Sequence, residues 1–291
     1  MKSSVKLFSL AVLTLLLVSS CGSDKKPYIQ FPADTIAKGL DKVQNFSIVL
    51  YDMNVDEEDK CFHKYKIIAQ TGDAPSLNID TSDSTAVAAA IADSAAVDPA
   101  DLGFEESITD WKQVSSEDFD FYSSDMGMEI YSKVDGKLSK ITAPPGYSQY
   151  VGNEKYGTWR TNSSGGSFWA FYGRYMFISS MFRLMSPVPY GYYSGYGAYR
   201  GSRPYYGPNG SAYGTGSKHA SGMNNGYAKR SASNSKLKNR VNNSVSKSAK
   251  ATGGKRTAAT TQSKSSSRTS RSGSRYSSSS SRSRSSSSGG K

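Results

Sequence analysis

The chain has 291 residues and a formal net charge of +12. Length alone would allow one or two domains, but from Gly201 to Lys291 there are 18 Lys and Arg and no Asp or Glu, and Ser fills 16 of the 28 positions from Lys264 to Lys291. Such a segment has too little apolar surface to offset the entropy of ordering, so composition excludes a second globular domain there.

The charges are divided along the chain. All 24 acidic residues lie at or before Glu154, whereas 23 of the 36 basic residues lie from Lys155 onward. Blocks of like charge usually mark interaction tails. The division therefore favours a binding or assembly role.

The first 20 residues are typical of a signal peptide. Lys2 and Lys6 precede an almost entirely apolar run, Leu7 to Val18, which is too short to span a bilayer comfortably. The sequence Val18-Ser19-Ser20-Cys21 resembles the lipobox of bacterial lipoproteins. This resemblance implies cleavage before Cys21, lipidation of Cys21 and attachment to a cell-envelope membrane. Gly22 then favours the outer membrane where a cell has two. An ordinary secretory signal is the alternative.

We expect a tether over 21–30 and one small α+β domain over 27–185. Pro32-Ala33-Asp34 resembles a helix start with Asp34 as the N-cap. Two runs rich in strand-forming residues, Phe46–Met53 and Cys61–Ala69, predict a hairpin around an acidic turn. In the second run Cys61, His63, Tyr65 and Ile67 share one face.

Further along, Ser84–Ala96 could form a helix or an acidic loop. Met126–Lys140 predicts a hairpin that turns at Asp135-Gly136. The four segments that follow resemble parts of uncharacterised bacterial exported proteins, a likeness that implies no activity: Pro144-Pro145-Gly146-Tyr147, Tyr150-Val151-Gly152-Asn153, Tyr156-Gly157-Thr158-Trp159 and Gly165-Gly166-Ser167-Phe168-Trp169.

Residues 168–185 predict a helix that is apolar on every side, which indicates either deep burial or a membrane. Arg174 near its middle makes a spanning segment costly. A core helix and an interfacial helix both stay open, and the interfacial one would place five aromatic side chains at the membrane: Phe168, Trp169, Phe171, Tyr172 and Phe177.

Enzyme signatures do not emerge from the sequence. Cys61 and His63 could share a strand face, but zinc needs three or four ligands, and His219, the second histidine, falls in the segment expected to be disordered. A nucleophilic cysteine would need a base and an orienting group. We therefore expect no catalytic residues, no metal site and no cofactor.

Residues 186–227 read as a Tyr- and Gly-rich linker, and 228–291 as a disordered basic tail. Lys and Arg attract anionic polymers in a salt-sensitive way that does not depend on sequence. The candidate polymers are lipopolysaccharide, cell-wall polymers and extracellular DNA, and the chain's own acidic half also qualifies. The predicted contact residues in the tail are Arg268, Arg271, Arg275, Arg282 and Arg284.

Together these features predict a membrane-anchored lipoprotein of the cell envelope with a binding or structural role and no enzymatic activity. The alternative is a membrane-active or membrane-organising protein that uses 168–185 as a second membrane contact.

Overall fold

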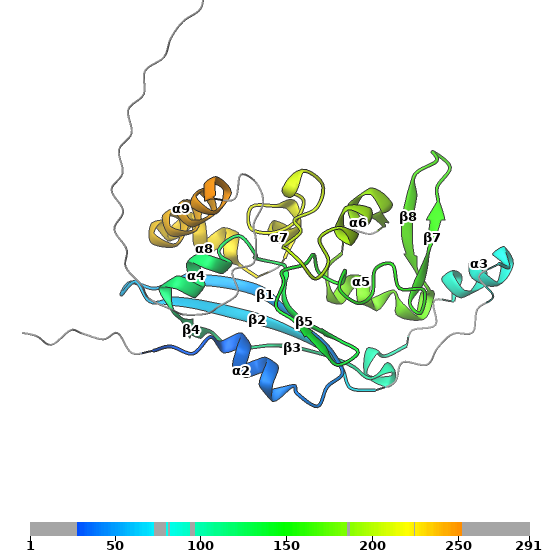
Figure 1. Ribbon diagram of the computed structural model, residues 1–291, viewed down its shortest axis with the longest axis horizontal. Coiled ribbons are helices and arrows are strands. Elements are labelled where there is room, and N and C mark those ends of the chain that lie inside the picture. The colour runs from blue at the N-terminus through cyan, green and yellow to red at the C-terminus, as the bar shows by residue number, and fades with distance from the viewer. Residues whose placement is uncertain are drawn as a thin grey trace, which may run out of the picture. The chain divides into compact units, whose positions relative to one another are not determined.

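The structure is a computed structural model that describes residues 28–72, 80, 82–93, 97–184, 187–223 and 225–251. It combines helices with antiparallel sheets (Figure 1), which confirms the predicted α+β class. The helices are α2 (Pro32–Gly39), α3 (Ser84–Ala92), α4 (Ser116–Tyr122), α5 (Phe177–Met181), α6 (Tyr190–Gly197), α7 (Lys218–Gly222), α8 (Tyr227–Ser233) and α9 (Ser235–Ala251). Short 3-10 turns are found at Pro99–Leu102, Gly173–Tyr175 and Pro208–Gly210.

The main sheet is six-stranded and antiparallel. Its strands are β1 (Asn45–Val55), β2 (Cys61–Gln70), β3 (Phe104–Ile108), β4 (Lys112–Val114), β5 (Glu129–Val134) and β6 (Lys137–Ser139). They follow the order β3-β2-β1-β5-β6, with β4 pairing with the other end of β2. The long hairpin of β1 and β2 therefore forms the centre of the molecule.

Both hairpins expected from the sequence are confirmed. β1 pairs with β2 from Asn45, which lies opposite Gln70, to Val55, which lies opposite Cys61. β5 pairs with β6 across Asp135-Gly136, where both turn residues have positive φ, 49° and 77°. A tight hairpin turn of this kind needs positive φ at both central positions, which Asp and Gly supply at low cost.

The first helix is also confirmed, but its cap is not the one expected. α2 begins at Pro32 with Phe31 in the N-cap position. The Asp34 carboxylate instead accepts hydrogen bonds from the Tyr131 hydroxyl and the Lys140 ammonium, each at 2.6 Å. Because Asp34 lies inside the first turn and does not cap the helix, its side chain can connect α2 to the sheet. The segment 84–96, left open by sequence, forms a helix over Ser84–Ala92, capped by Asp83.

Alternate side chains of β1 point into two different cores, and a β-bulge shifts this alternation by one residue. The register shifts between Leu50 and Asp52, so Tyr51 is the extra residue. Ile48 and Leu50 on one side of the bulge, and Met53 beyond it, belong to a core shared with α2, α4 and α9. The opposite face of the sheet contributes Val49 and Ile68 to a second core rich in Tyr, Phe and Trp.

The predicted helix over 168–185 is wrong. Its first part is strand β8 (Ser167–Phe171), which pairs with β7 (Gly157–Thr161) and β9 (Val188–Pro189) in a second sheet. Among the described residues of this segment, 168–184, the α-helical ones are the five of α5. Aromatic residues favour strands, and the turn at Asn162–Gly166 starts a hairpin, with Asn162 Oδ1 accepting from the Ser164 and Gly166 amides.

The predicted linker over 186–227 is wrong as well, because its tyrosines pack into the Tyr-rich core. Tyr196, Tyr205 and Tyr213 are buried there, and the Tyr213 and Tyr147 hydroxyls lie 2.7 Å apart. At Gly214 (φ 85°) an added Cβ would lie 2.4 Å from the Ser124 carbonyl oxygen. Tyr can serve as a large apolar residue when its hydroxyl finds a partner, so a Tyr/Gly composition does not by itself indicate a linker.

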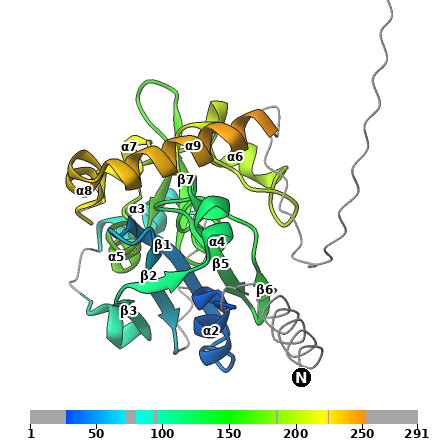
Figure 2. The same ribbon diagram turned by 90° about the vertical axis from the view of Figure 1, so that its left-hand side faces the viewer.

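The folded part also extends beyond residue 228. Helices α8 and α9 pack together and against β1 and α4 (Figures 1 and 2), and Leu237 and Val241 of α9 are buried. The domain predicted to end at 185 therefore continues at least to α9. The rest of the predicted tail, and its arginines, lie outside the described residues.

Candidate functional site

Basic residues of α8 and α9 contact the acidic first half of the chain. Arg230 pairs with Asp52, Lys236 lies 3.1 Å from Asp59, and Arg240 binds Asp120 through two hydrogen bonds of 3.0 and 3.2 Å. The charge division in the sequence is therefore used within the fold, up to Arg240.

At one of these contacts the surface is hollowed into a cleft of about 460 Å³. β1 and β2 form its floor with Tyr51, Asp52 and Lys64. One wall is the end of β3 with the loop to β4, and the other is the start of α8; these walls contribute Ile108, Thr109, Asp110, Trp111, Asn225 and Arg230.

The β1 bulge positions the acidic group of the cleft. Because Tyr51 is the extra residue, Asp52 becomes the cross-strand partner of Lys64, and the two side chains lie on the same face of the sheet. Bulges often redirect a side chain next to a functional site.

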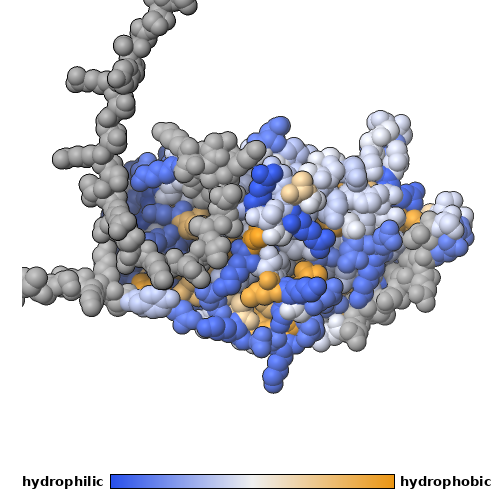
Figure 3. All heavy atoms as spheres, viewed as in Figure 1, coloured by the Kyte–Doolittle hydropathy of each residue, from blue (hydrophilic) through white to orange (hydrophobic). Residues whose placement is uncertain are grey.

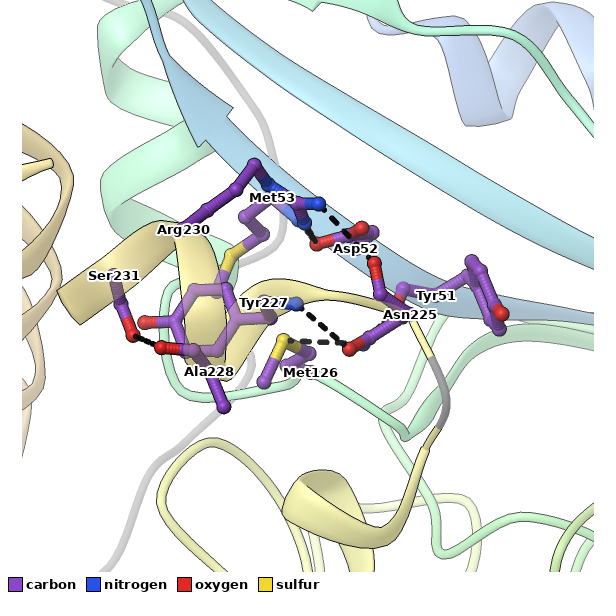
Figure 4. A network of polar contacts seen from close by, with 9 residues as sticks. All are labelled: Tyr51, Asp52, Met53, Met126, Asn225, Tyr227, Ala228, Arg230 and Ser231. Atoms are coloured by element: carbon purple, nitrogen blue, oxygen red, sulfur yellow. Dashed lines mark hydrogen bonds and ion pairs between the residues drawn. The ribbon is translucent and has the colours of Figure 1, made fainter. Parts of the chain in front are cut away.

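Asp52 and Arg230 form the central ion pair of the cleft (Figure 4). The Asp52 side chain is 2% exposed and also accepts from the Met53 amide at 2.8 Å. Arg230 donates a second hydrogen bond to the Asn225 carbonyl oxygen at 3.2 Å. Burial raises the pKa of Asp52, and Arg230 opposes that rise. Removing the guanidinium would leave a buried carboxylate without a cation, an expensive state.

Asn225 fixes the position of the segment that carries Arg230. Its side-chain amide donates to the Tyr51 carbonyl oxygen at 2.7 Å and accepts from the Tyr227 amide at 3.0 Å. Figure 4 shows Asn225 beside β1, between Tyr51 and the start of α8. The bulge, the ion pair and α8 are thus held as one unit.

Trp111 stands on the opposite wall, half-buried, with two cations near its ring. Lys64 Nζ lies 5.4 Å and Arg230 Cζ 5.1 Å from the indole centroid. Thr109 fixes the loop, since its amide donates to the Tyr65 carbonyl at 2.9 Å and its hydroxyl accepts from the Tyr65 amide at 3.1 Å. The cleft therefore offers an aromatic ring, ammonium and guanidinium donors and carboxylate acceptors in a fixed frame.

A second polar centre lies inside the fold at Glu129, which is 1% exposed. Its carboxyl group accepts from the Ser47 hydroxyl at 3.0 Å, the Gly146 amide at 2.8 Å and the Ser148 hydroxyl at 2.5 Å. Burial raises its pKa to about 7 despite these hydrogen bonds. Glu129 lines none of the clefts described and joins three segments of the fold.

Some of the sites predicted from the sequence lie outside the described residues, and others lie within them. Cys21 and Arg268, Arg271, Arg275, Arg282 and Arg284 lie outside the described residues. Of the aromatic residues predicted to touch a membrane, Trp169, Phe171 and Tyr172 are buried, and Phe177 is half-buried and packs on the same core. Phe168 is half-buried in β8. The predicted membrane contact is therefore corrected, because four of the five rings already pack in a protein core.

The face drawn in Figure 3 is largely hydrophilic, with apolar residues in small separate patches. Within the described ranges no helix combines the length and apolar character needed to cross a membrane.

Cys61 and His63 lie in the core beside α4. His63 Nδ1 is 3.2 Å from the Tyr65 hydroxyl, and burial lowers the pKa of its imidazole to about 3. His219, expected in a disordered segment, is buried in α7. Among the residues that the structure describes, no group of three or more His, Cys, Asp or Glu could hold a metal ion.

Sequence reasoning missed the cleft. Nothing in the sequence around Trp111 pairs it with Arg230, 119 positions further on. The charge division was the usable signal, because it made the chain's own acidic half one of the candidate partners of the basic segment, without indicating which residues meet.

A comparison with protein-family models, curated proteins and solved structures finds no match to this chain. The lipobox and exported-protein resemblances stay predictions.

Proposed function

We propose that this protein is a cell-envelope lipoprotein without enzymatic activity, attached to the membrane through Cys21, whose basic C-terminal segment binds anionic envelope polymer. The observation that carries the proposal is the charge division: nine Lys and Arg follow Ala251, and every acid of the chain lies at or before Glu154.

The contacts of α8 and α9 support this assignment. Asp52, Asp59 and Asp120 already have Arg230, Lys236 and Arg240 as partners. Those three carboxylates are thus occupied by cations that come before residue 251. An external polyanion is the partner that best suits the cations after it, since it would release counterions on binding.

The anchor is tested by expressing the full chain, with its own leader, in a bacterium. We expect the wild-type protein to carry acyl mass at Cys21 and to sediment with membranes, and Cys21→Ala to lose both. Several acyl chains are needed for stable attachment, so the loss should be nearly complete. Wild-type protein without acyl mass would contradict the anchor.

The tail is tested by replacing Arg268, Arg271, Arg275, Arg282 and Arg284 together by Gln, with a matched control in which all five become Lys. Dissociation constants are measured for lipopolysaccharide, teichoic acid and double-stranded DNA at several salt concentrations. We expect the Gln variant to bind each polymer at least about tenfold more weakly. For DNA, the slope of log K against log salt concentration should become shallower by as much as about four. The Lys variant keeps the charge and should bind nearly as wild type does. Equal binding by wild-type and Gln proteins would overturn the role of the tail.

A further inference from the structure

The Asp52–Arg230 cleft combines hydrogen-bond donors and acceptors without an excess of either charge. Lys64 and Arg230 are matched in formal charge by Asp52 and Asp110. Within the described residues neither Lys64 nor Asp110 forms an ion pair, so the ammonium and the carboxylate are available to a ligand. A ligand with hydroxyl groups, each both donor and acceptor, matches this lining better than a simple anion does.

The indole of Trp111 supplies an apolar surface among these polar groups. Elsewhere in the fold Arg203 stacks flat on Tyr199 with 3.9 Å between Cζ and the ring centroid. At Trp111 the distances are 5.1 Å for Arg230 Cζ and 5.4 Å for Lys64 Nζ, so both cations are within cation–π range of the indole, and Trp111 is still partly exposed. Half-exposed Trp rings stack on ligands that have one apolar face. The exposed Ile108, 46% accessible, extends that apolar surface along the same wall.

The cleft is built before any ligand arrives. Asp52 is held by Arg230 and the Met53 amide, Asn225 ties Tyr51 to α8, and Thr109 is bonded twice to Tyr65. A frame fixed in this way lowers the entropy that a ligand must offset on binding. The volume of about 460 Å³ lies within the usual range for small-molecule sites.

We propose that this cleft binds an uncharged sugar unit of an envelope polysaccharide. The C–H face of the sugar ring would lie on Trp111, and its hydroxyls would accept from Lys64 and Arg230 and donate to Asp110. This inference deepens the proposed function, because it gives the folded domain its own contact with envelope polymer. Two linked contacts strengthen each other through effective concentration.

The test uses calorimetric titration of the full-length protein with linear tetrasaccharides of glucose, mannose, galactose and N-acetylglucosamine. At least one of them should bind the wild-type protein, and Trp111→Ala should weaken that binding by tenfold or more. Lys64→Gln should weaken it several-fold, because a neutral amide replaces the charged donor. Lys112→Gln is the matched control, because Lys112 is an exposed neighbour of Trp111 that does not line the cleft, and its binding should equal that of wild type.

Salt separates this cleft from the tail. Binding of an uncharged tetrasaccharide should change little with salt and persist in the variant with five Arg→Gln substitutions, whereas polyanion binding should be at least about tenfold weaker there. Failure of all four sugars to bind at about 5 mM would overturn the proposal, as would unchanged binding by Trp111→Ala and Lys64→Gln. Circular dichroism and thermal melting of each variant identify unfolding, and the substitution Lys64→Gln, at a half-buried position, decides the matter if Trp111→Ala unfolds.

Discussion

Glu129 is a single residue on which much of the fold depends. Its carboxyl group is enclosed between β1, β5 and the turn after Pro145, where it accepts from Ser47, Gly146 and Ser148. Burial is the largest cause of its raised pKa, and the three donors only partly offset that effect. The proton is therefore held more tightly in the folded protein than in the unfolded chain.

The raised pKa of Glu129 predicts that the stability of the fold depends on pH. Because the folded-state pKa of about 7 exceeds the ordinary value of 4.5, the contribution of Glu129 is complete below about pH 4.5 and is lost as pH rises through 7. Wild-type protein should lose on the order of 3 kcal/mol of unfolding free energy from this group between pH 5 and 8. Glu129→Gln keeps the shape without a titrating group, while His63 and His219 titrate alike in both proteins, so from pH 5 to 8 the unfolding free energy of the variant should rise relative to that of wild type by this amount, as measured from urea midpoints. Parallel pH profiles for the two proteins would show that Glu129 does not carry the effect.

At the scale of single elements, α9 is an amphipathic helix fixed along one side. Leu237, Val241 and Ser244 are buried at a spacing of four and three residues, and Ser244 donates to Asp120 at 2.8 Å. Arg240 binds the same carboxylate, and its guanidinium lies 5.4 Å from the Phe119 ring. The helix is thus attached by apolar burial and by ionic contacts to α4.

This packing predicts that α9 contributes to the stability of the whole domain. Leu237→Ala removes a side chain with no exposed surface and should lower the free energy of unfolding by about 2–5 kcal/mol. Lys238→Ala, on the exposed side of the same helix, should change it by less than about 0.5 kcal/mol. Urea denaturation followed by tryptophan fluorescence measures both. If Leu237→Ala and Lys238→Ala were equally harmless, residues 228–251 would behave as the tail that composition suggests.

Elements with short-range signals could be predicted from the sequence. β1, β2 and the hairpin at Asp135-Gly136 depend on strand-forming runs and a turn dipeptide, which are local features. The aromatic run from Phe168 could not be assigned in this way, because a run that is apolar at every position fits a buried strand and a buried helix alike. The run forms a strand because β7 pairs with it across the turn that joins them.

For the candidate site, the sequence carried the charge imbalance but not the geometry. Arg230 reaches Asp52 across 178 positions, and the register of Asp52 with Lys64 depends on one bulged residue, Tyr51. No local pattern encodes either contact. The tyrosines after 190 were misread for a related reason. Their segment has a composition low in aliphatic residues, but its rings pack against Tyr147, which lies far away in the sequence.

At the scale of the whole molecule, basic residues of α8 and α9 are folded onto the acidic first half of the chain within the residues that the structure describes. Asn234 donates to the Val55 carbonyl at 2.7 Å and Lys236 to the Glu57 carbonyl at 2.6 Å, next to the ion pairs of Arg230 and Arg240. Exposed ion pairs alone contribute little. These contacts act together with the burial of Leu237 and Val241, and the combination makes α8 and α9 part of the same domain as the first half of the chain.

Limited digestion with trypsin tests this arrangement in the full-length protein. Cleavage needs locally opened backbone, so lysines and arginines within packed helices are cut slowly even when their side chains are exposed. We expect a stable fragment whose C-terminus, found by intact mass, lies beyond Arg240, with Arg200, Arg203 and Lys229 uncut. Early cleavage at Arg200 or Arg203 would instead mean that the Tyr-rich segment is the flexible linker suggested by its composition. Leu237→Ala should shift the first cuts to Lys229 and Arg230, because loosening α9 exposes the helix that closes the cleft.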